Sequence, residues 1–287
     1  MTRSYRLVLP FVVLLLAAGA ACRKAPQRVN EVVAVPSAKL PLNPADPAWD
    51  RAPEHLAKLI PQDLVEPRLM KPSTSEVMVR ALTNGSEVAF RLQWTDKEKN
   101  DAPGPASMVD ACAIQIPKKV DPNPPAPQMG EAGKPVEVTF WRADWQAIVN
   151  GRGDTIRDLY PNASIDHYPY NAKSLEPGSA VQKEFASRYA PARALGNDRG
   201  GPRTSPVEDL VADGPGTLAP AASTTSKGQG GRTATGWSVV ISRRAPQGLA
   251  PRQRTRIAFA VWEGSEKESG ARKMRTGWIP LLVQGEK

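Results

Sequence analysis

Two alternating runs of apolar and polar residues, joined by an Asn-Gly pair, constrain the fold of this chain more than any other feature. Residues 77–82 and 87–94 both alternate between side chains suited to a core and side chains suited to water. Such alternation is typical of a β-strand with one buried face, because successive side chains of a strand point to opposite faces. Asn84-Gly85 lies between the runs, and this dipeptide readily adopts the positive φ angles of a tight hairpin turn. The sequence therefore predicts an antiparallel hairpin here.

Further strand-like runs, separated by turn residues, extend this prediction to most of the chain. They lie at residues 111–116, 136–141, 236–242, 256–262 and 277–283. The high proline and glycine counts, 29 and 22, favour a loop-rich β protein over a helical bundle. We therefore predict an all-β fold: an antiparallel β-sandwich with long loops and few short helices. Residues 150–225 are polar and predicted to be irregular, and a loop of that length usually covers a site or a partner.

The N-terminus has the order of a secretory signal peptide. Arg3 and Arg6 precede an almost wholly apolar stretch at residues 7–18, and small residues follow it. That stretch is too short to span a membrane. We therefore expect residues 1–21 to be a signal peptide, residues 22–44 to be a tether, and residues 45–287 to form one folded domain, within which Trp49 and Ala52 anchor a short element on a core.

Cys22 directly follows the small residues, where a bacterial lipoprotein carries its lipid-accepting cysteine. The usual lipoprotein signal has a leucine three places earlier, whereas this chain has Gly19. Two interpretations stay open: lipidation of Cys22, which makes the tether a lipoprotein linker, and ordinary cleavage near Ala20. No second apolar stretch reaches spanning length, so any membrane contact is expected to come from a lipid anchor alone.

The few cysteines and histidines exclude several kinds of site. Cys22 and Cys112 are too few for a disulfide scaffold, a cysteine-ligated iron–sulfur cluster or a zinc–thiolate site. No Cys-x-x-Cys-His motif is present, which excludes covalent c-type heme. His55 and His167 are the only histidines, and nothing marks either as a catalytic base. The net charge of +9 suits an anionic surface or an acidic partner, but export argues against nucleic acid.

A Met-Gly pair at residues 129–130 follows a proline-rich loop and precedes a predicted strand. A methionine in such a place is usually a core residue. The chain as a whole, however, resembles the heme b (gamma) subunit of ethylbenzene dehydrogenase and its relatives in the type II dimethyl sulfoxide reductase family of molybdenum enzymes. The matching residues are 46–49 with Ala52, 79–81, 90–96, 110–117, 129–130, 135–136, 141–143, 158–162, 216–218, 236–243, 258–264 and 273–278.

This resemblance implies a β-sandwich that holds heme b between loops at one end, with the iron bound by a methionine and a lysine. Met129 lies on the family's Met-Gly motif and would be the thioether ligand. Lys227, before the predicted strand at 236–242, is the lysine expected to be the second ligand, with His167 as the fallback and His55 also open. A lysine binds iron only as the neutral amine, and deprotonation at pH 7 costs about 4–5 kcal/mol.

The same resemblance implies a non-catalytic electron-transfer subunit in the periplasm. Its partners would be a molybdopterin catalytic subunit, an iron–sulfur subunit and a cytochrome c-type carrier. An alternative of another class stays open: a cofactor-free carbohydrate-binding or adhesive β-sandwich, whose families share the Asp-Pro-Ala-Trp opening of residues 46–49. That alternative predicts several exposed aromatic side chains on one face of the domain.

Overall fold

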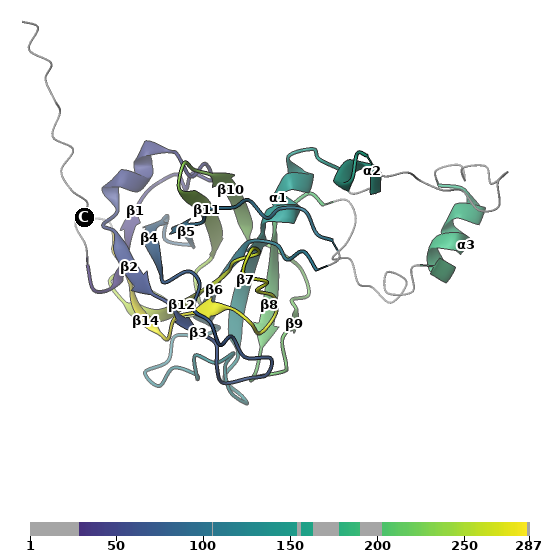
Figure 1. The fold of residues 1–287 in the computed structure, drawn as a ribbon. Coiled ribbons are helices and arrows are strands. Elements are labelled where there is room, and N and C mark those ends of the chain that lie inside the picture. The colour runs from purple at the N-terminus through teal and green to yellow at the C-terminus, as the bar shows by residue number, and fades with distance from the viewer. Residues whose placement is uncertain (1–28, 105, 154–155, 163–177, 190–202, 286–287) are drawn as a thin grey trace, which may run out of the picture.

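The computed structural model describes residues 29–104, 106–153, 156–162, 178–189 and 203–285. Within them the chain is mostly β-structure, arranged as two sheets joined through the long strand β12 (Arg254–Trp262) (Figure 1). Residues 254–257 of β12 pair with the first sheet, and residues 258–262 pair with the second. The predicted all-β class with few short helices is confirmed.

The first sheet contains the predicted hairpin. β4 (Glu76–Thr83) and β5 (Glu87–Thr95) are antiparallel, and Gly85 in the turn between them has a φ of 93°, which glycine adopts at little cost. The strand order is β10 (Lys227–Arg232), β11 (Gly236–Arg244), β5, β4, β1 (Val32–Pro36) and β14 (Ile279–Val283), with β2 (His55–Lys58) also paired to β4.

The second sheet is antiparallel throughout its described strands. Its order is β12, β6 (Ala111–Pro117), β7 (Val136–Arg142), β8 (Val207–Ala212) and β9 (Ala219–Pro220), while β13 (Met274–Arg275) joins β12 to β3 (Ile60–Pro61). The helices are η1 (Pro47–Arg51), a 3-10 helix, and α1 (Ala143–Val149), α2 (Ile156–Leu159) and α3 (Ala180–Tyr189). Figure 1 shows α2 and α3 set to one side of the strands. None of the described helices is long and apolar enough to cross a membrane.

The main core lies between the two sheets and is filled by alternate residues of their strands. Phe90 and Leu92 of β5 and Ile114 of β6 are all buried there. Trp141 of β7 packs edge-on against Trp237 of β11, with ring centroids 5.2 Å apart, so aromatic side chains link the two layers. Each such buried side chain stabilises the fold by about 1.5–3 kcal/mol.

The outer face of the first sheet is covered by the segment that contains η1. Trp49 and Ala52 pack there in a buried cluster with Leu82 of β4. The Trp49 indole Nε1 donates a hydrogen bond to the carbonyl of Asn43 (3.1 Å), which fixes the ring. The predicted anchoring role of these two residues is confirmed. The η1 segment covers only the first sheet, and the outer face of the second sheet carries a cavity.

Two regions predicted to be irregular contain regular structure. β1 lies inside the segment 22–44 assigned to a tether, and it pairs in parallel with β14 and β4. Its five residues do not alternate and its partners are distant in sequence, so no local pattern marks it. The prediction that the whole of 150–225 is irregular was wrong, because β8 there buries Val207 and Leu210 against the second sheet, and α2, α3 and β9 also lie in this region.

Candidate cofactor site

A cavity of about 560 Å³ lies on the outer face of the second sheet. Its floor is built from small side chains that alternate with large ones along two paired strands. Cys112 and Ile114 of β6 point into the main core, whereas Ala111 and Ala113 point to the cavity, and Ala260 of β12 pairs directly with Ala113. The side chains of this sheet that face the cavity are thus small alanines, whereas Ile114 on the opposite face is large. The sheet therefore presents a shallow apolar bed suited to a flat molecule.

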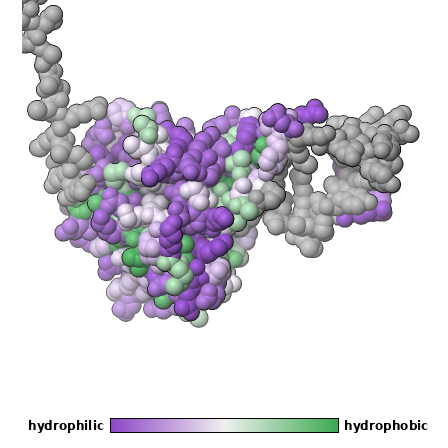
Figure 2. Space-filling view, in the orientation of Figure 1, coloured by the Kyte–Doolittle hydropathy of each residue, from purple (hydrophilic) through white to green (hydrophobic). Residues whose placement is uncertain are grey.

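The walls of this cavity are aromatic and aliphatic. Phe140 of β7 and Trp262 of β12 meet edge to face, with ring centroids 5.0 Å apart and an interplanar angle of 72°. At the rim, Leu64, Val65 and Leu218 line the cavity and yet remain 55%, 40% and 44% exposed. The surface seen in Figure 2 is mostly hydrophilic with small hydrophobic groups, so this exposed apolar rim favours a site that a bound molecule covers.

Met129 lines the cavity from the loop before β7, and its position depends on the glycine that follows it. Met129 and Gly130 both have positive φ angles, 68° and 81°. A Cβ atom on Gly130 would lie 3.0 Å from the carbonyl oxygen of Lys134 and 3.1 Å from that of Ala212, so a side chain there would be both strained and crowded. The left-handed conformation of Met129 itself costs about 1 kcal/mol or more, and such strain concentrates at functional sites.

Two side chains fix the loop that carries Met129. The indole Nε1 of Trp278 donates a hydrogen bond to the carbonyl of Pro125 (2.6 Å). The amide Nε2 of Gln115, on β6, donates one to the carbonyl of Pro127 (3.0 Å). The loop is therefore tied both to the cavity floor and to the chain that follows β13.

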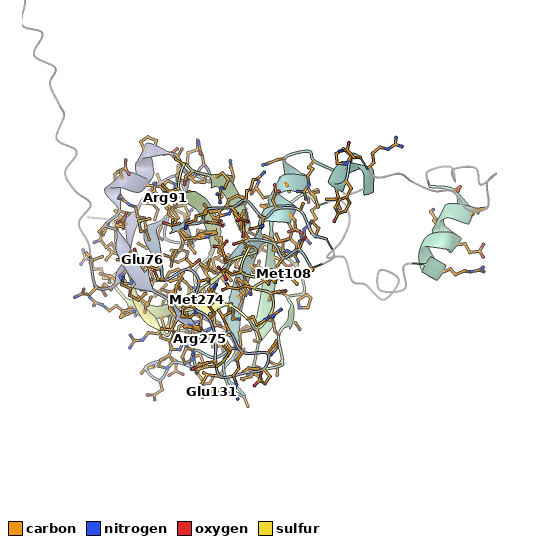
Figure 3. All side chains as sticks on the ribbon, in the orientation of Figure 1. Glu76, Arg91, Met108, Glu131, Met274 and Arg275 are labelled. Atoms are coloured by element: carbon orange, nitrogen blue, oxygen red, sulfur yellow. The ribbon has the colours of Figure 1, made fainter. Side chains whose placement is uncertain are left out.

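Lys273 lines the same cavity and directly precedes β13. Alternation along this short strand sends Met274 into the main core, where it is 1% exposed, while Lys273 and Arg275 line the cavity. In Figure 3, Met274 and Arg275 are labelled close together near the middle of the β body. Burial, together with the charge of Arg275, lowers the pKa of the Lys273 ammonium to about 8. The cost of the neutral amine at pH 7 thereby falls to about 1–2 kcal/mol.

Two arginines supply positive charge to the cavity. Arg142 forms a two-pronged ion pair with Asp144, at 2.9 and 2.8 Å. Arg275 has its Nη2 3.8 Å from Asp63, and its buried Nε has no hydrogen-bond acceptor among the described residues. The charge of Arg275 is thus less tightly paired within the chain than that of Arg142.

The structure brings only one of the two predicted ligands to this cavity. Met129 lines it. Lys227 does not: it is an exposed residue at the start of β10, opposite Ser242 of β11 in the first sheet. Lys227 therefore lies away from this cavity, and the lysine that lines it is Lys273. His55 lies on β2 and its Nδ1 is 2.8 Å from the carbonyl of Val29, away from the cavity lining.

The remaining predicted residues, His167 and Cys22, lie outside the described residues. Lys273 was not predicted as a site residue, because the lysine expected from the resemblance was Lys227, before the strand at 236–242. Lys273 opens the last matching segment, 273–278, and stands two residues before Arg275 in an alternating pattern. A lysine on the inward side of a strand-like run was the signal that could have identified it.

The cavity fits heme b in shape and in donor chemistry. Its apolar bed and aromatic walls suit a flat macrocycle, and Arg142 and Arg275 bring positive charge to the lining for the propionates. A thioether and an amine with a lowered pKa are both competent iron ligands. Met108 also lines the cavity and is a second thioether there.

Comparison with known proteins places the chain in a family. It is 25% identical over 283 residues to the "Putative respiratory nitrate reductase heme subunit ORF7" of Haloferax mediterranei, covering 94% of this chain and 79% of that protein. Two structures of a family 9 carbohydrate-binding module from Caldicellulosiruptor kristjanssonii, with glucose and with cellotriose, are 7% and 8% identical. The alignments cover 91% of this chain and 97% and 95% of the two solved chains, and their TM-scores are only 0.37 and 0.38. The ethylbenzene dehydrogenase family matches residues 46–274, most of the sequence, and the chain belongs to that family.

Proposed function

We propose that this chain is a heme b electron-transfer subunit of an oxidoreductase complex and performs no substrate chemistry itself. The observation that carries the proposal is the presence of Met129 and Lys273 on one alanine-floored cavity. Family membership and the heme subunit of Haloferax mediterranei agree with it.

The residues of the cavity have distinct roles in this proposal. The heme, when bound, supplies an iron that alternates between the ferric and ferrous states. The soft thioether of Met129 favours the ferrous state and so raises the potential. The lowered pKa of Lys273 makes its neutral amine available near neutral pH. Met129 and Lys273 would both bind the iron, and Phe140 and Trp262 would keep water from the apolar bed. Both features would favour electron transfer over substrate binding.

The partners and location are proposed on the resemblance and on the relative's name. We place the chain in the periplasm, beside a molybdopterin catalytic subunit and an iron–sulfur subunit, with a cytochrome c-type carrier as the other exchange partner. The N-terminal segment supports export, and a lipid on Cys22 would hold the complex at a membrane surface.

A cofactor-free sugar-binding sandwich is less well supported. Such a domain needs exposed aromatic side chains on one face. Among the described large hydrophobic residues that are exposed, Tyr160 is the single aromatic. Trp49, Trp94 and Trp145 are buried, as expected of core residues.

The test is titration of the purified mature chain with hemin, followed by visible spectra before and after dithionite reduction. We expect saturation at one heme per chain, sharp α and β bands on reduction, and no change on adding carbon monoxide, because both axial positions are filled. A folded chain that binds no hemin would contradict the proposal. A reduced heme that binds carbon monoxide at once would contradict the two-ligand assignment.

A further inference from the structure

Three carboxylates from three separate strands meet at one end of the sandwich. Asp96 directly follows β5, Asp110 directly precedes β6, and Glu263 directly follows β12. Ala111 and Trp262 are a register pair, which places Asp110 and Glu263 side by side, while Asp96 comes from the first sheet. One carboxylate oxygen from each lies within 4.8 Å of the others, and the three residues are 3%, 0% and 7% exposed.

Neutral donors hold this acid cluster in place. Asp110 accepts hydrogen bonds from the backbone N–H groups of Gly264 (2.9 Å) and Asn100 (2.8 Å) and from the Trp237 indole (3.0 Å). The hydroxyl of Ser265 donates to Glu263 (2.9 Å). These contacts orient the oxygens but carry no positive charge.

Little positive charge from the chain opposes the cluster. Among the described residues, Arg232 forms the ion pair with the acid cluster. Its Nη1 is 3.5 Å from Oδ1 of Asp96. Burial first, and then the charge of Asp96, raise the pKa values of Asp110 and Glu263 above their ordinary range. Three buried carboxylates beside one arginine leave an unbalanced negative site.

Two buried oxygens at the cluster have no donor among the described residues when Glu263 is ionised. The Asp96 side chain is 0% exposed, and its Oδ1 accepts from the N–H of Glu98 (2.9 Å), but its Oδ2 has no hydrogen-bond partner among the described residues while Glu263 is ionised. Oδ1 of Asn100 is likewise buried, and no donor to it lies in the part of the chain that the structure describes. The Asn100 side chain fits at this place because residue 264 is a glycine. A Cβ atom on Gly264 would lie only 2.5 Å from the Asn100 side chain. A buried acceptor without a donor destabilises the fold, and a bound cation removes that penalty.

We propose that Asp96, Asp110 and Glu263 form a structural Ca²⁺ site. The donors are all oxygens. Such a site binds hard cations in preference to metals that favour nitrogen or sulfur ligands. Ca²⁺ suits the irregular arrangement better than Mg²⁺, which demands near-ideal octahedral geometry. The site ties the ends of β5, β6 and β12, so it joins the two sheets next to Ala111 and Trp262 of the cavity. This inference does not rest on the proposed heme function.

The test uses the mature chain freed of metal with a chelator. We expect Ca²⁺ to bind at one ion per chain in isothermal titration calorimetry. At a concentration about a hundred times the dissociation constant, it should raise the melting temperature by about 5–10 °C. Tb³⁺ should bind in its place and luminesce on tryptophan excitation, because the Trp237 indole contacts Asp110. Added Ca²⁺ should quench that signal by displacement.

Glu263→Gln keeps the shape of the side chain and removes one charge. We expect it to melt in chelator no lower than the wild type and yet to lose the response to Ca²⁺ and Tb³⁺. Glu266→Gln, an exposed neighbour whose carboxylate pairs with Lys71, is the matched control and should keep both responses. A wild-type chain that binds no Ca²⁺ at millimolar concentration overturns the proposal. So does a folded Glu263→Gln chain that responds like the wild type, or an equal shift with Mg²⁺.

Discussion

The Nζ atom of Lys273 lies 5.1 Å from the centroid of the Trp262 ring, inside a cavity whose floor is alanine. An ammonium over an indole face is stabilised, but burial works against the charge and lowers the pKa to about 8. The lysine is therefore held between its two protonation states near physiological pH.

The affinity of the apoprotein for heme should depend on pH through this lysine. Only the neutral amine binds iron, so protonation competes with ligation, and the competition weakens as pH rises. We expect the association constant for hemin to rise about tenfold per pH unit below pH 8 and to level off above it. Hemin titrations between pH 6 and 9 measure this. In Lys273→Ala the dependence should disappear, and a wild type with a flat profile would exclude the role of Lys273.

The Met-Gly turn should be intolerant of a side chain at its second residue. Gly130→Ala introduces a Cβ at 3.0 Å from a carbonyl oxygen in a left-handed conformation, and we expect a loss of about 2–3 kcal/mol in unfolding free energy. Gly133→Ala is the control, because Gly133 has a φ of 78° but open space around it, and should cost about 1 kcal/mol. Urea denaturation compares the two. Equal losses would show that crowding at Gly130 is unimportant.

The turn at β4–β5 was predictable from sequence because it rests on a local signal. The Asn84-Gly85 hairpin and the buried Trp49 both depend on residues next to each other in the chain. β1 was not predictable in this way, because it pairs with strands far along the chain. The alternation of residues 273–275 marks Lys273 as an inward side chain, but its place on the cavity depends on β13 joining β12 to β3. The local pattern contains no sign of such long-range pairings.

Filling the alanine bed should exclude heme without unfolding the chain. Ala260 pairs with Ala113 on the cavity floor, and Ala260→Leu places a larger apolar side chain where space exists. We expect at least about a tenfold weaker affinity for hemin, with a melting temperature unchanged or higher in the heme-free chain. Ala221→Leu, on a separate cavity of about 320 Å³ near Arg243, is the control and should bind hemin normally. Normal binding by Ala260→Leu would place the heme elsewhere.

The central claim is that Met129 and Lys273 hold the iron, and one set of spectra tests it most directly. Reduced visible spectra and near-infrared magnetic circular dichroism of the hemin-loaded wild type should be compared with Met129→Ala and Lys273→Ala. The controls are Met108→Ala, the other cavity thioether, and Lys227→Ala, the exposed lysine of β10. We expect the low-spin signature to be lost in Met129→Ala and Lys273→Ala and retained in both controls. A low-spin spectrum that survives Lys273→Ala but is lost in Lys227→Ala would contradict this site.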